Sequence, residues 1–473
     1  MLKGPPGQRR ALAAVALGVF CIQLDAFALN LALPSIGHDL GASTGSLQWA
    51  VSAYLLSTGT LMLGAGRLSD LWGRRRLLVV GLALFGASSL ACATAPSLPL
   101  LVGARVAQGA GASLIMPVGL ALLTNVYPAD QRGRATGWAL GMGGVATACG
   151  PFVGGALTEA ASWRAIFWIN VPLAVAAAVW ASRTPGSRDT AAAPAVDWRG
   201  LAFATAALAA VAVFVERGPV WGWTSPRDGL VLAAAAVLLV AFVRHEGRVA
   251  DPLVNLGLFR NGPFVVLTVA GAVANAATVL FLFVVPLALQ GSWGLTAFAA
   301  GVAFLAPAAM MAVAGPLAGR VTPGAAVNVM ALLLALAGGM LCAAPAIGAL
   351  PVHLATMTVC GGVLGLANAL TLIATQAVIR PERAGEASGV TKTVITVAAG
   401  LGVALSGAVA DPDGRPASSA AADHALTATG LAALAAGLLL GVWSAARAWA
   451  DRTGRTRPEA GRTRRAMART GRR

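Results

Sequence analysis

The sequence predicts an all-α polytopic membrane protein, and three observations support this fold class. Of the 473 residues, 57% are hydrophobic and only 11% are charged, with a mean hydropathy of +0.76, whereas a soluble domain carries about 25% charged residues. The apolar residues form long runs, and the basic residues lie in the short gaps between runs or near the C-terminus. The sequence also lacks the ten-residue stretches of alternating apolar and polar residues that would indicate a membrane barrel. This composition excludes an ordinary soluble enzyme, a disordered chain and a secreted disulfide scaffold.

Fourteen apolar runs are candidates for membrane-spanning helices, since about 20 apolar residues cross a bilayer. The eighth run is shorter than the others. The first run is expected to remain in the protein as a membrane-spanning helix. It is not followed by the small-residue cleavage site at which a signal peptide is removed. In chain order the runs cover residues 11–34, 47–66, 76–95, 97–125, 134–158, 164–182, 199–216, 229–243, 262–290, 297–319, 325–347, 352–379, 386–410 and 425–447.

The placement of arginine and lysine predicts the orientation in the membrane. With the N-terminus inside, 28 of the 34 basic residues fall in cytoplasmic segments, four fall outside, and Arg105 and Lys392 lie within spans. Basic residues are enriched in cytoplasmic loops, so we expect a multi-pass protein of the plasma membrane with both termini in the cytoplasm. This placement also argues against a nucleic-acid partner, despite the net charge of +16. The basic C-terminal residues are expected to contact anionic lipid.

The chain is predicted to contain two similar halves. Residues 65–70 (AGRLSD) follow the second run, and residues 314–319 (AGPLAG) end the tenth, at the same place within a group of six runs. Parallel repeats of six helices are a known transporter plan. We therefore predict an N-terminal six-helix bundle at 1–182, an inserted helix pair with cytoplasmic linkers at 183–261, a C-terminal six-helix bundle at 262–447 and a basic cytoplasmic tail at 448–473.

Asp25 is the acidic residue that lies well inside a predicted span. A charge near the bilayer centre costs about 2.5–3.5 kcal/mol on insertion scales, so such groups are rare and usually functional. Asp25 and Arg105 are both predicted to lie roughly 12–14 Å below the outer surface, at about 1.5 Å per residue. They could form a static ion pair between the first and fourth helices. We favour the alternative, in which the carboxylate takes up a proton on one side and releases it on the other.

Lys392 and several polar residues inside the spans are further candidates. Lys392 is either a side chain that extends to the interface or a cation in a cavity for anionic or zwitterionic substrates. The polar residues could line a substrate path, although each is more often a helix–helix hydrogen bond. Asn30 is the strongest of them, five residues from Asp25. The others are Gln23, Gln48, Tyr54, Asn275, Asn368 and Gln376.

No pattern of catalytic or metal-ligating residues occurs. A GxxxxGK[ST] phosphate loop is absent, so ATP is not expected to drive the protein. The four histidines are dispersed, and the five cysteines lie inside apolar runs without CxxC spacing. We expect no enzymatic activity, no metal site and no cofactor.

Residues 66–76 (GRLSDLWGRRR) closely resemble the signature loop between helices 2 and 3 of the major facilitator superfamily. Gly66 and Gly73 permit a tight turn, and Asp70 can cap a helix or pair with an arginine such as Arg74. In that family the loop holds the two halves together on the cytoplasmic side in the outward-open state. The resemblance therefore implies a cytoplasmic gating loop at these residues.

Further stretches resemble the drug:proton antiporter branch of this family, which has fourteen helices. They are residues 24–34 (LDAFALNLALP), 105–112 (RVAQGAGA), 150–155 (GPFVGG) and 163–172 (WRAIFWINVP). The resemblance assigns Asp25 and Arg105 to proton coupling and adds Gln108 to the candidates for the substrate cavity. In the antiporter motif, small residues allow close helix contact and the proline bends the helix. The matching residues are Gly150, Pro151, Gly154 and Gly155.

The sequence departs from the family pattern at three positions. Phe27 stands where a small hydroxyl residue is usual, which adds it to the cavity candidates. Ala146 replaces a glycine, and Lys392 stands where a polar amide is common.

The resemblance implies the major facilitator fold, with two six-helix bundles and two inserted helices. It also implies a monomeric, proton-coupled secondary exporter of small amphipathic compounds such as antibiotics or dyes, working by alternating access. Its partners would be the small-molecule substrate, protons and the bilayer, and the proton gradient would drive it without a cofactor. Two alternatives remain open: a dedicated exporter or proton symporter for one metabolite, and a non-transporting membrane sensor with the same fold.

Overall fold

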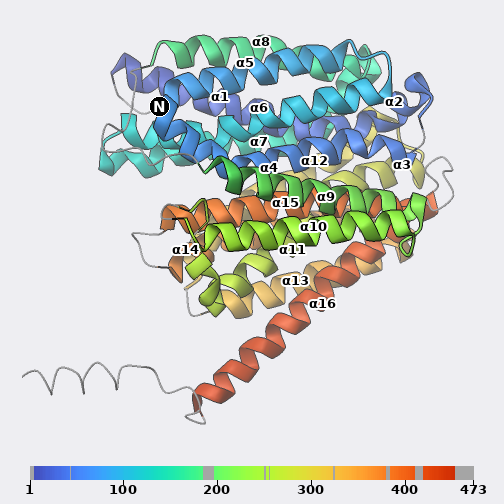
Figure 1. Ribbon diagram of the computed structural model, residues 1–473. Coiled ribbons are helices and arrows are strands. Elements are labelled where there is room, and N and C mark those ends of the chain that lie inside the picture. Colours follow the sequence, from blue (N-terminus) through green and yellow to red (C-terminus); the bar gives the residue numbers. More distant parts are fainter. Residues whose placement is uncertain are drawn as a thin grey trace, which may run out of the picture.

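The computed structural model is built from helices throughout the part of the chain that it describes, with no strand there (Figure 1). The described residues are 5–42, 44–184, 197–249, 252–254, 256–322, 325–379, 384–410 and 419–452. The all-α fold predicted from composition is therefore confirmed. The predicted tail at 448–473 falls mostly outside the described residues.

The first six apolar runs form one group of packed helices, in the upper part of Figure 1. Pro34 does not end the first helix, because a 3-10 turn carries the chain onward into α2. The group contains α1 (Pro6–Ala28), η1 (Leu29–Ala32), α2 (Leu33–Leu40), the single turn α3 (Thr44–Leu47), α4 (Trp49–Trp72), α5 (Arg74–Ala93), α6 (Leu98–Val126), α7 (Ala129–Ala160) and α8 (Arg164–Ser182).

The last six runs form a second group, most of which lies in the lower part of Figure 1, while α12 is seen higher, beside α7. It contains α11 (Gly262–Gly291), α12 (Ala297–Ala314), η3 (Gly315–Arg320), α13 (Ala326–Ala343), η4 (Ala344–Ala346), α14 (Leu350–Ala377), α15 (Ala384–Ala410) and α16 (Ser419–Arg452). The two groups meet where α7 packs against α12, where α4 packs against α15, and where η1 touches α11.

Each predicted run overlaps one long helix of the structure, and some also include a short helix next to it, but the count of fourteen spans is not confirmed. Twelve helices in the described residues are long and apolar enough to cross a membrane. The described apolar part of α15, Gly389–Val403, is shorter than a span, and α4 is not among the twelve. The exact domain boundaries also stay a prediction.

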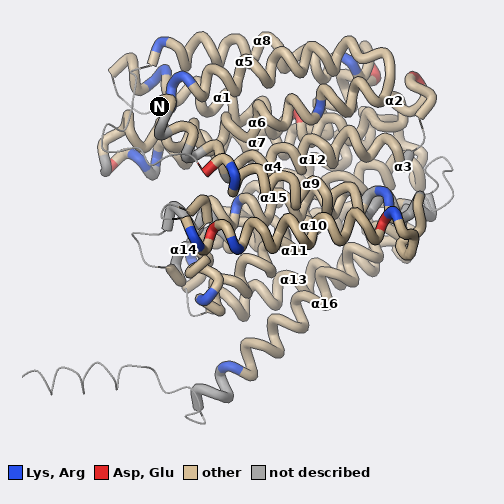
Figure 2. The backbone as a smooth tube through the Cα atoms, viewed as in Figure 1, with Lys and Arg blue, Asp and Glu red and all other residues tan. Residues whose placement is uncertain are grey.

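The charged residues follow the predicted asymmetry along the helices. In Figure 2, most of the lysine and arginine segments lie at the end of the helices where the N-terminus is marked. This is the pattern expected when that end faces the cytoplasm. The orientation itself stays a prediction.

The seventh and eighth runs form the antiparallel pair α9 (Trp198–Trp221) and α10 (Pro226–Glu246), followed by η2 (Leu256–Arg260). Asp197 caps α9, because its Oδ1 atom accepts a hydrogen bond from Gly200 N–H at 2.9 Å. The same oxygen lies 2.7 Å from His245 Nε2 on α10. Burial raises the pKa of the Asp197 carboxyl, but the bonds from Gly200 and His245 outweigh burial and hold the pKa below its usual range.

The chain that follows α10 is attached to the same end of this helix pair. Glu246 accepts a hydrogen bond from Val254 N–H at 2.8 Å through its Oε2 atom. α9 then packs against both α4 and α15, so the pair touches both six-helix groups. Asp197 and Glu246 therefore connect the start of α9, the end of α10 and the following linker.

We predict that Asp197→Ala lowers the free energy of unfolding by about 1 kcal/mol, the usual cost of losing a helix N-cap. Thermal unfolding of the detergent-purified protein measures this. Asp197→Asn is the control, because asparagine caps a helix about as well and should retain most of the stability. An unchanged melting temperature for Asp197→Ala would show that this contact does not stabilise the helix pair.

Candidate functional site

The structure brings Asp25 on α1 and Arg105 on α6 together as an ion pair. Both side chains are 0% exposed. Asp25 Oδ2 accepts a hydrogen bond from Arg105, and Oδ1 accepts from Gln108 Nε2 at 3.0 Å and from Asn170 Nδ2 at 2.7 Å. The carboxylate is therefore surrounded by donors from α6 and α8.

Arg105 is held by groups other than Asp25 as well. Its Nε atom donates to the Ala50 carbonyl on α4 at 2.7 Å, and its guanidinium lies 4.2 Å from the ring centroid of Tyr54. Its Nη1 atom also donates to Gln108 Oε1 at 2.7 Å. The Nη2 atom is buried without a hydrogen-bond partner in the described structure. A buried unsatisfied donor costs about 1–3 kcal/mol.

Tyr54 and Gln108 connect this site to neighbouring helices. The Tyr54 hydroxyl donates to the Ile22 carbonyl at 3.1 Å, one turn before Asp25 on α1. Gln108 Nε2 also donates to the Ser89 hydroxyl on α5 at 2.8 Å. Both residues were candidates for the substrate cavity, and in this conformation both serve the ion-pair network.

Asn170 and Ser89 belong to this network but were not selected from the sequence. Asn170 lies within the stretch at 163–172 that resembles the family, and it is fully buried in the otherwise apolar α8. That lone amide in an apolar run was the available signal. Ser89 carried no comparable signal, because a serine often bonds to its own helix, as Ser89 does to the Phe85 carbonyl at 2.7 Å.

The three asparagine candidates form hydrogen bonds between helices. Asn30 on η1 donates to the Leu282 carbonyl on α11 at 3.1 Å, across the two groups of helices. Asn275 donates to the Ile395 carbonyl at 2.8 Å, and Asn368 donates to Thr278 Oγ1 at 2.6 Å. These contacts are those of helix–helix hydrogen bonds, and a role in substrate binding stays a prediction.

Lys392 on α15 extends across to the other group of helices. Its Nζ atom lies 3.9 Å from Met116 Sδ on α6. No acidic side chain of the described residues pairs with it. Its direction favours the interpretation as a cation between the two groups over a side chain that reaches the membrane surface.

The predicted gating loop is formed differently from the expectation. Gly66 does not turn the chain, because it lies within α4, which ends only at Trp72. The turn is made by Gly73 alone, with a φ of 89°, a value that glycine adopts readily. Arg74 follows at the start of α5 and its Nη1 atom lies 3.4 Å from the Ala121 carbonyl of α6. The side chain of Asp70 falls outside the described residues.

The glycines of the antiporter motif allow α7 to pass very close to two other helices. A Cβ atom added to Gly154 would lie 1.9 Å from the Ala28 carbonyl oxygen at the end of α1. One added to Gly155 would lie 2.4 Å from the Ala297 carbonyl oxygen of α12. Pro151 lies inside α7, and a Cβ on Gly150 would meet the Phe27 Cβ at 2.8 Å. This stretch therefore brings α1, α7 and α12 into backbone contact.

A hydrogen bond and an aromatic contact also join α7 to α12 of the other group. Glu159 Oε2 accepts a hydrogen bond from Phe298 N–H in the first turn of α12, at 3.1 Å. The Phe152 and Phe298 rings lie 5.7 Å apart. Together with Asn30 and Gly155, these contacts hold the two groups together at the end that is predicted to face outward.

Two six-helix groups joined by close small-residue contacts, with a buried ion pair inside one of them, define the architecture of a secondary membrane transporter. Residues 15–403 match the family described as Major Facilitator Superfamily, and the chain belongs to this family. The family predicted from the sequence motifs is therefore confirmed.

Curated relatives cover most of the chain. "Multidrug resistance protein Stp" of Mycobacterium tuberculosis is 33% identical over 413 residues, which are 85% of this chain and 76% of that protein. The tetracenomycin C resistance and export protein of Streptomyces glaucescens is 32% identical over 86% of this chain and 76% of its own length. The puromycin resistance protein of Streptomyces alboniger is 33% identical over 85% of this chain and 82% of its own length. All three names refer to resistance against drugs or antibiotics, and one also refers to export.

Solved structures with the same fold include a POT family transporter in complex with 5-aminolevulinic acid. Its TM-score is 0.70 at 14% identity, over 93% of this chain and 96% of that one. A D-xylose-proton symporter has a TM-score of 0.67 at 14% identity, over 91% of this chain and 97% of that one. At this identity the likeness concerns the fold alone, and the protein is an integral membrane protein of that fold.

We predict that Gly154→Ala destabilises the protein, because the added methyl group would overlap the Ala28 carbonyl; overpacking of this kind costs roughly 1–3 kcal/mol. Gly144→Ala on the same helix is the matched control, since a Cβ there has nothing within 4 Å. Thermal unfolding and the monodisperse fraction after detergent extraction measure both variants. If Gly154→Ala were as stable as Gly144→Ala, the close contact between α7 and α1 would not exist.

Proposed function

We propose that the protein is a proton-coupled antiporter that exports small amphipathic compounds, such as antibiotics or dyes, by alternating access. The buried Asp25–Arg105 pair is the observation that carries this proposal. It places one titratable carboxylate inside the bundle, in contact with α6 and α8. The names of the relatives, which refer to multidrug resistance and to antibiotic resistance or export, support the substrate class.

In the proposed cycle, Asp25 takes up a proton from the outer side and releases it towards the cytoplasm, while the substrate moves in the opposite direction. Protonation neutralises Asp25 and weakens its attraction to Arg105. Removing the partner of a buried charge usually costs about 3–5 kcal/mol. Arg105 would keep the Ala50 carbonyl and the Tyr54 ring when Asp25 separates from it, and these contacts lower that cost.

The energy for export would come from the proton gradient alone. One elementary charge that crosses a potential of 100 mV releases about 2.3 kcal/mol, which is sufficient to move a substrate against a concentration ratio of about 50. No cofactor or metal is needed for this step. We further propose a monomer in the plasma membrane with both termini in the cytoplasm.

We predict that Asp25→Asn abolishes substrate-linked proton movement but leaves folded protein in the membrane, because asparagine has a similar shape but cannot carry the proton. In everted vesicles, adding substrate to the wild type should discharge a pre-formed pH gradient, and the variant should behave like vesicles without the protein. Asp39→Asn is the matched control. Asp39 also pairs with an arginine, Arg164, but the two side chains are 45% and 33% exposed.

Retained discharge of the gradient in Asp25→Asn would contradict the carboxylate assignment. A proton flux in the same direction as the substrate would identify a symporter, and no flux in the wild type would favour a sensor. Loss of coupling in Asp39→Asn as well would mean that the effect is not specific to the buried pair.

A dedicated exporter for one compound is the second candidate, because some relatives are named for a single antibiotic, for example the cephamycin export protein of Amycolatopsis lactamdurans. We expect several unrelated amphipathic compounds to be exported. A susceptibility panel in an efflux-deficient host, compared with the compounds that discharge the pH gradient, tests this expectation. Protection against one compound alone would favour the dedicated exporter.

A further inference from the structure

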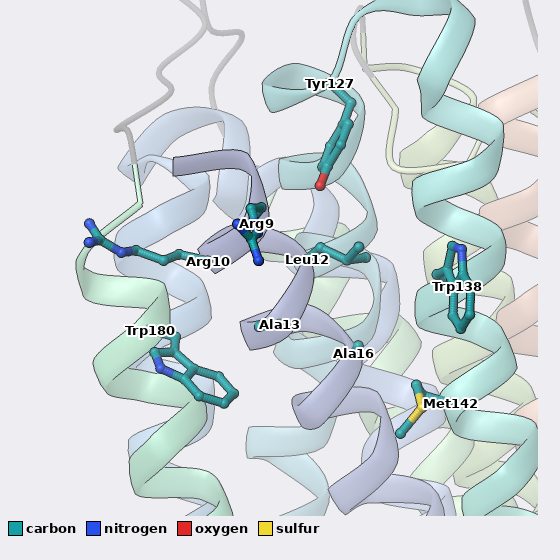
Figure 3. Close-up of a pocket in the computed structure, with 9 residues that line it drawn as sticks. All are labelled: Arg9, Arg10, Leu12, Ala13, Ala16, Tyr127, Trp138, Met142 and Trp180. Atoms are coloured by element: carbon teal, nitrogen blue, oxygen red, sulfur yellow. The ribbon is translucent and has the colours of Figure 1, made fainter. Parts of the chain in front are cut away.

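A groove on the surface of the protein runs along α1, away from the Asp25 site. It is about 410 Å³ in volume and is bordered by α1, α7 and α8 (Figure 3). Among the residues of α1 that line the groove, Ala16 is the one nearest to Asp25 in the sequence, nine positions before it. At about 1.5 Å per residue, the two are separated by roughly 13 Å along the helix. The groove is therefore a separate feature of the helix that carries the carboxylate.

The lining of the groove changes from basic to apolar along α1. Figure 3 shows Arg9 and Arg10 at one end, near the start of α1, and Ala13 and Ala16 progressively further along the helix. Met142 on α7 lies further still from the two arginines in the same view. The groove thus has a cationic end on the side predicted to be cytoplasmic and an apolar floor towards the membrane interior.

Two tryptophans border this groove, one on each flanking helix. Trp138 on α7 and Trp180 on α8 are 54% and 40% exposed, and Figure 3 shows them on opposite sides of α1. Tryptophan is enriched at the level of the lipid headgroups, where its ring is partly in hydrocarbon and its N–H is near water. Their position indicates that the groove opens sideways into the membrane rather than into the protein interior.

Within the described residues, the two arginines have no partner that would explain their position. Both are exposed, and neither guanidinium forms a hydrogen bond or ion pair with another residue in the described parts of the chain. The other groups that line the groove are uncharged. An anionic group near Arg9 and Arg10 would meet two positive charges and no lining acid, and guanidinium groups bind phosphate well.

We propose that this groove binds an anionic phospholipid of the cytoplasmic leaflet. The phosphate group lies beside Arg9 and Arg10, and an acyl chain lies against Ala13, Ala16 and Met142. The apolar floor and the sideways opening distinguish this ligand from a free phosphate, which would use only the cationic end. The site depends on the membrane location of the protein and not on proton coupling.

Native mass spectrometry of the detergent-purified protein tests the proposal by titration with phosphatidylglycerol and, in parallel, with phosphatidylcholine of the same acyl chains. The wild type should bind phosphatidylglycerol more tightly than phosphatidylcholine. Arg9→Gln/Arg10→Gln should weaken that binding by about 30-fold, the effect of two surface arginines on an anionic lipid. Arg244→Gln/Arg248→Gln is the matched control, because it removes the same charge from two exposed positions, one in the last turn of α10 and one just after the helix.

Two further variants separate a specific site from a general charge effect. Ala13→Phe keeps both arginines but fills the floor, and it should weaken phosphatidylglycerol binding. Arg9→Lys/Arg10→Lys keeps the charge and should retain most of the phosphatidylglycerol binding. This variant and Ala13→Phe also test the proposal if the glutamine variant fails to fold. Equal losses in the control and the groove variants, no effect of Ala13→Phe, or full competition by glycerol phosphate would each overturn the proposal.

Discussion

The buried ion pair between Asp25 and Arg105 is the interaction that places the strongest demand on the rest of the structure. Both side chains are fully buried, and a buried charge that loses its partner costs about 3–5 kcal/mol. Neighbours must therefore fill most of the remaining hydrogen-bonding positions, although Arg105 Nη2 has no partner in the described structure. Gln108 and Asn170 serve the carboxylate and the Ala50 carbonyl serves the guanidinium, so one charge pair constrains the positions of α1, α4, α6 and α8 together.

Close backbone contact is the second constraint, and it concentrates on α7. Helices in a membrane gain little from burying apolar side chains, because lipid is equally apolar, so association depends on close approach and on hydrogen bonds. Gly154 allows α7 to contact α1 within its own group, and Gly155, one residue further, allows contact with α12 of the other group. The same short stretch therefore determines packing within one bundle and between the two, and α7 lies where any rocking of one bundle against the other must be accommodated.

α1 connects three features that are otherwise separate. It carries Asp25 in its last turn, it continues through η1 to the contact between Asn30 and α11, and its first turns border the cationic groove. A lipid in that groove would touch the same helix that positions the carboxylate. A movement of α1 would therefore shift Asp25, the Asn30 contact and the groove together.

The sequence by itself determined the local features, since hydropathy, charge and backbone freedom act over a few residues. These include the positions of the helices, the turn at Gly73, the equal depth of Asp25 and Arg105, and the family. The tertiary structure decided which groups meet. Alanine-, glycine- and leucine-rich helices are apolar on every face, so their periodicity does not reveal which face is buried. For this reason the sequence did not identify Asn170 as a partner of Asp25, nor the Leu282 carbonyl, 252 residues away, as the partner of Asn30. A backbone carbonyl such as that of Ala50 carries no residue identity, and only the fold could place it beside Arg105.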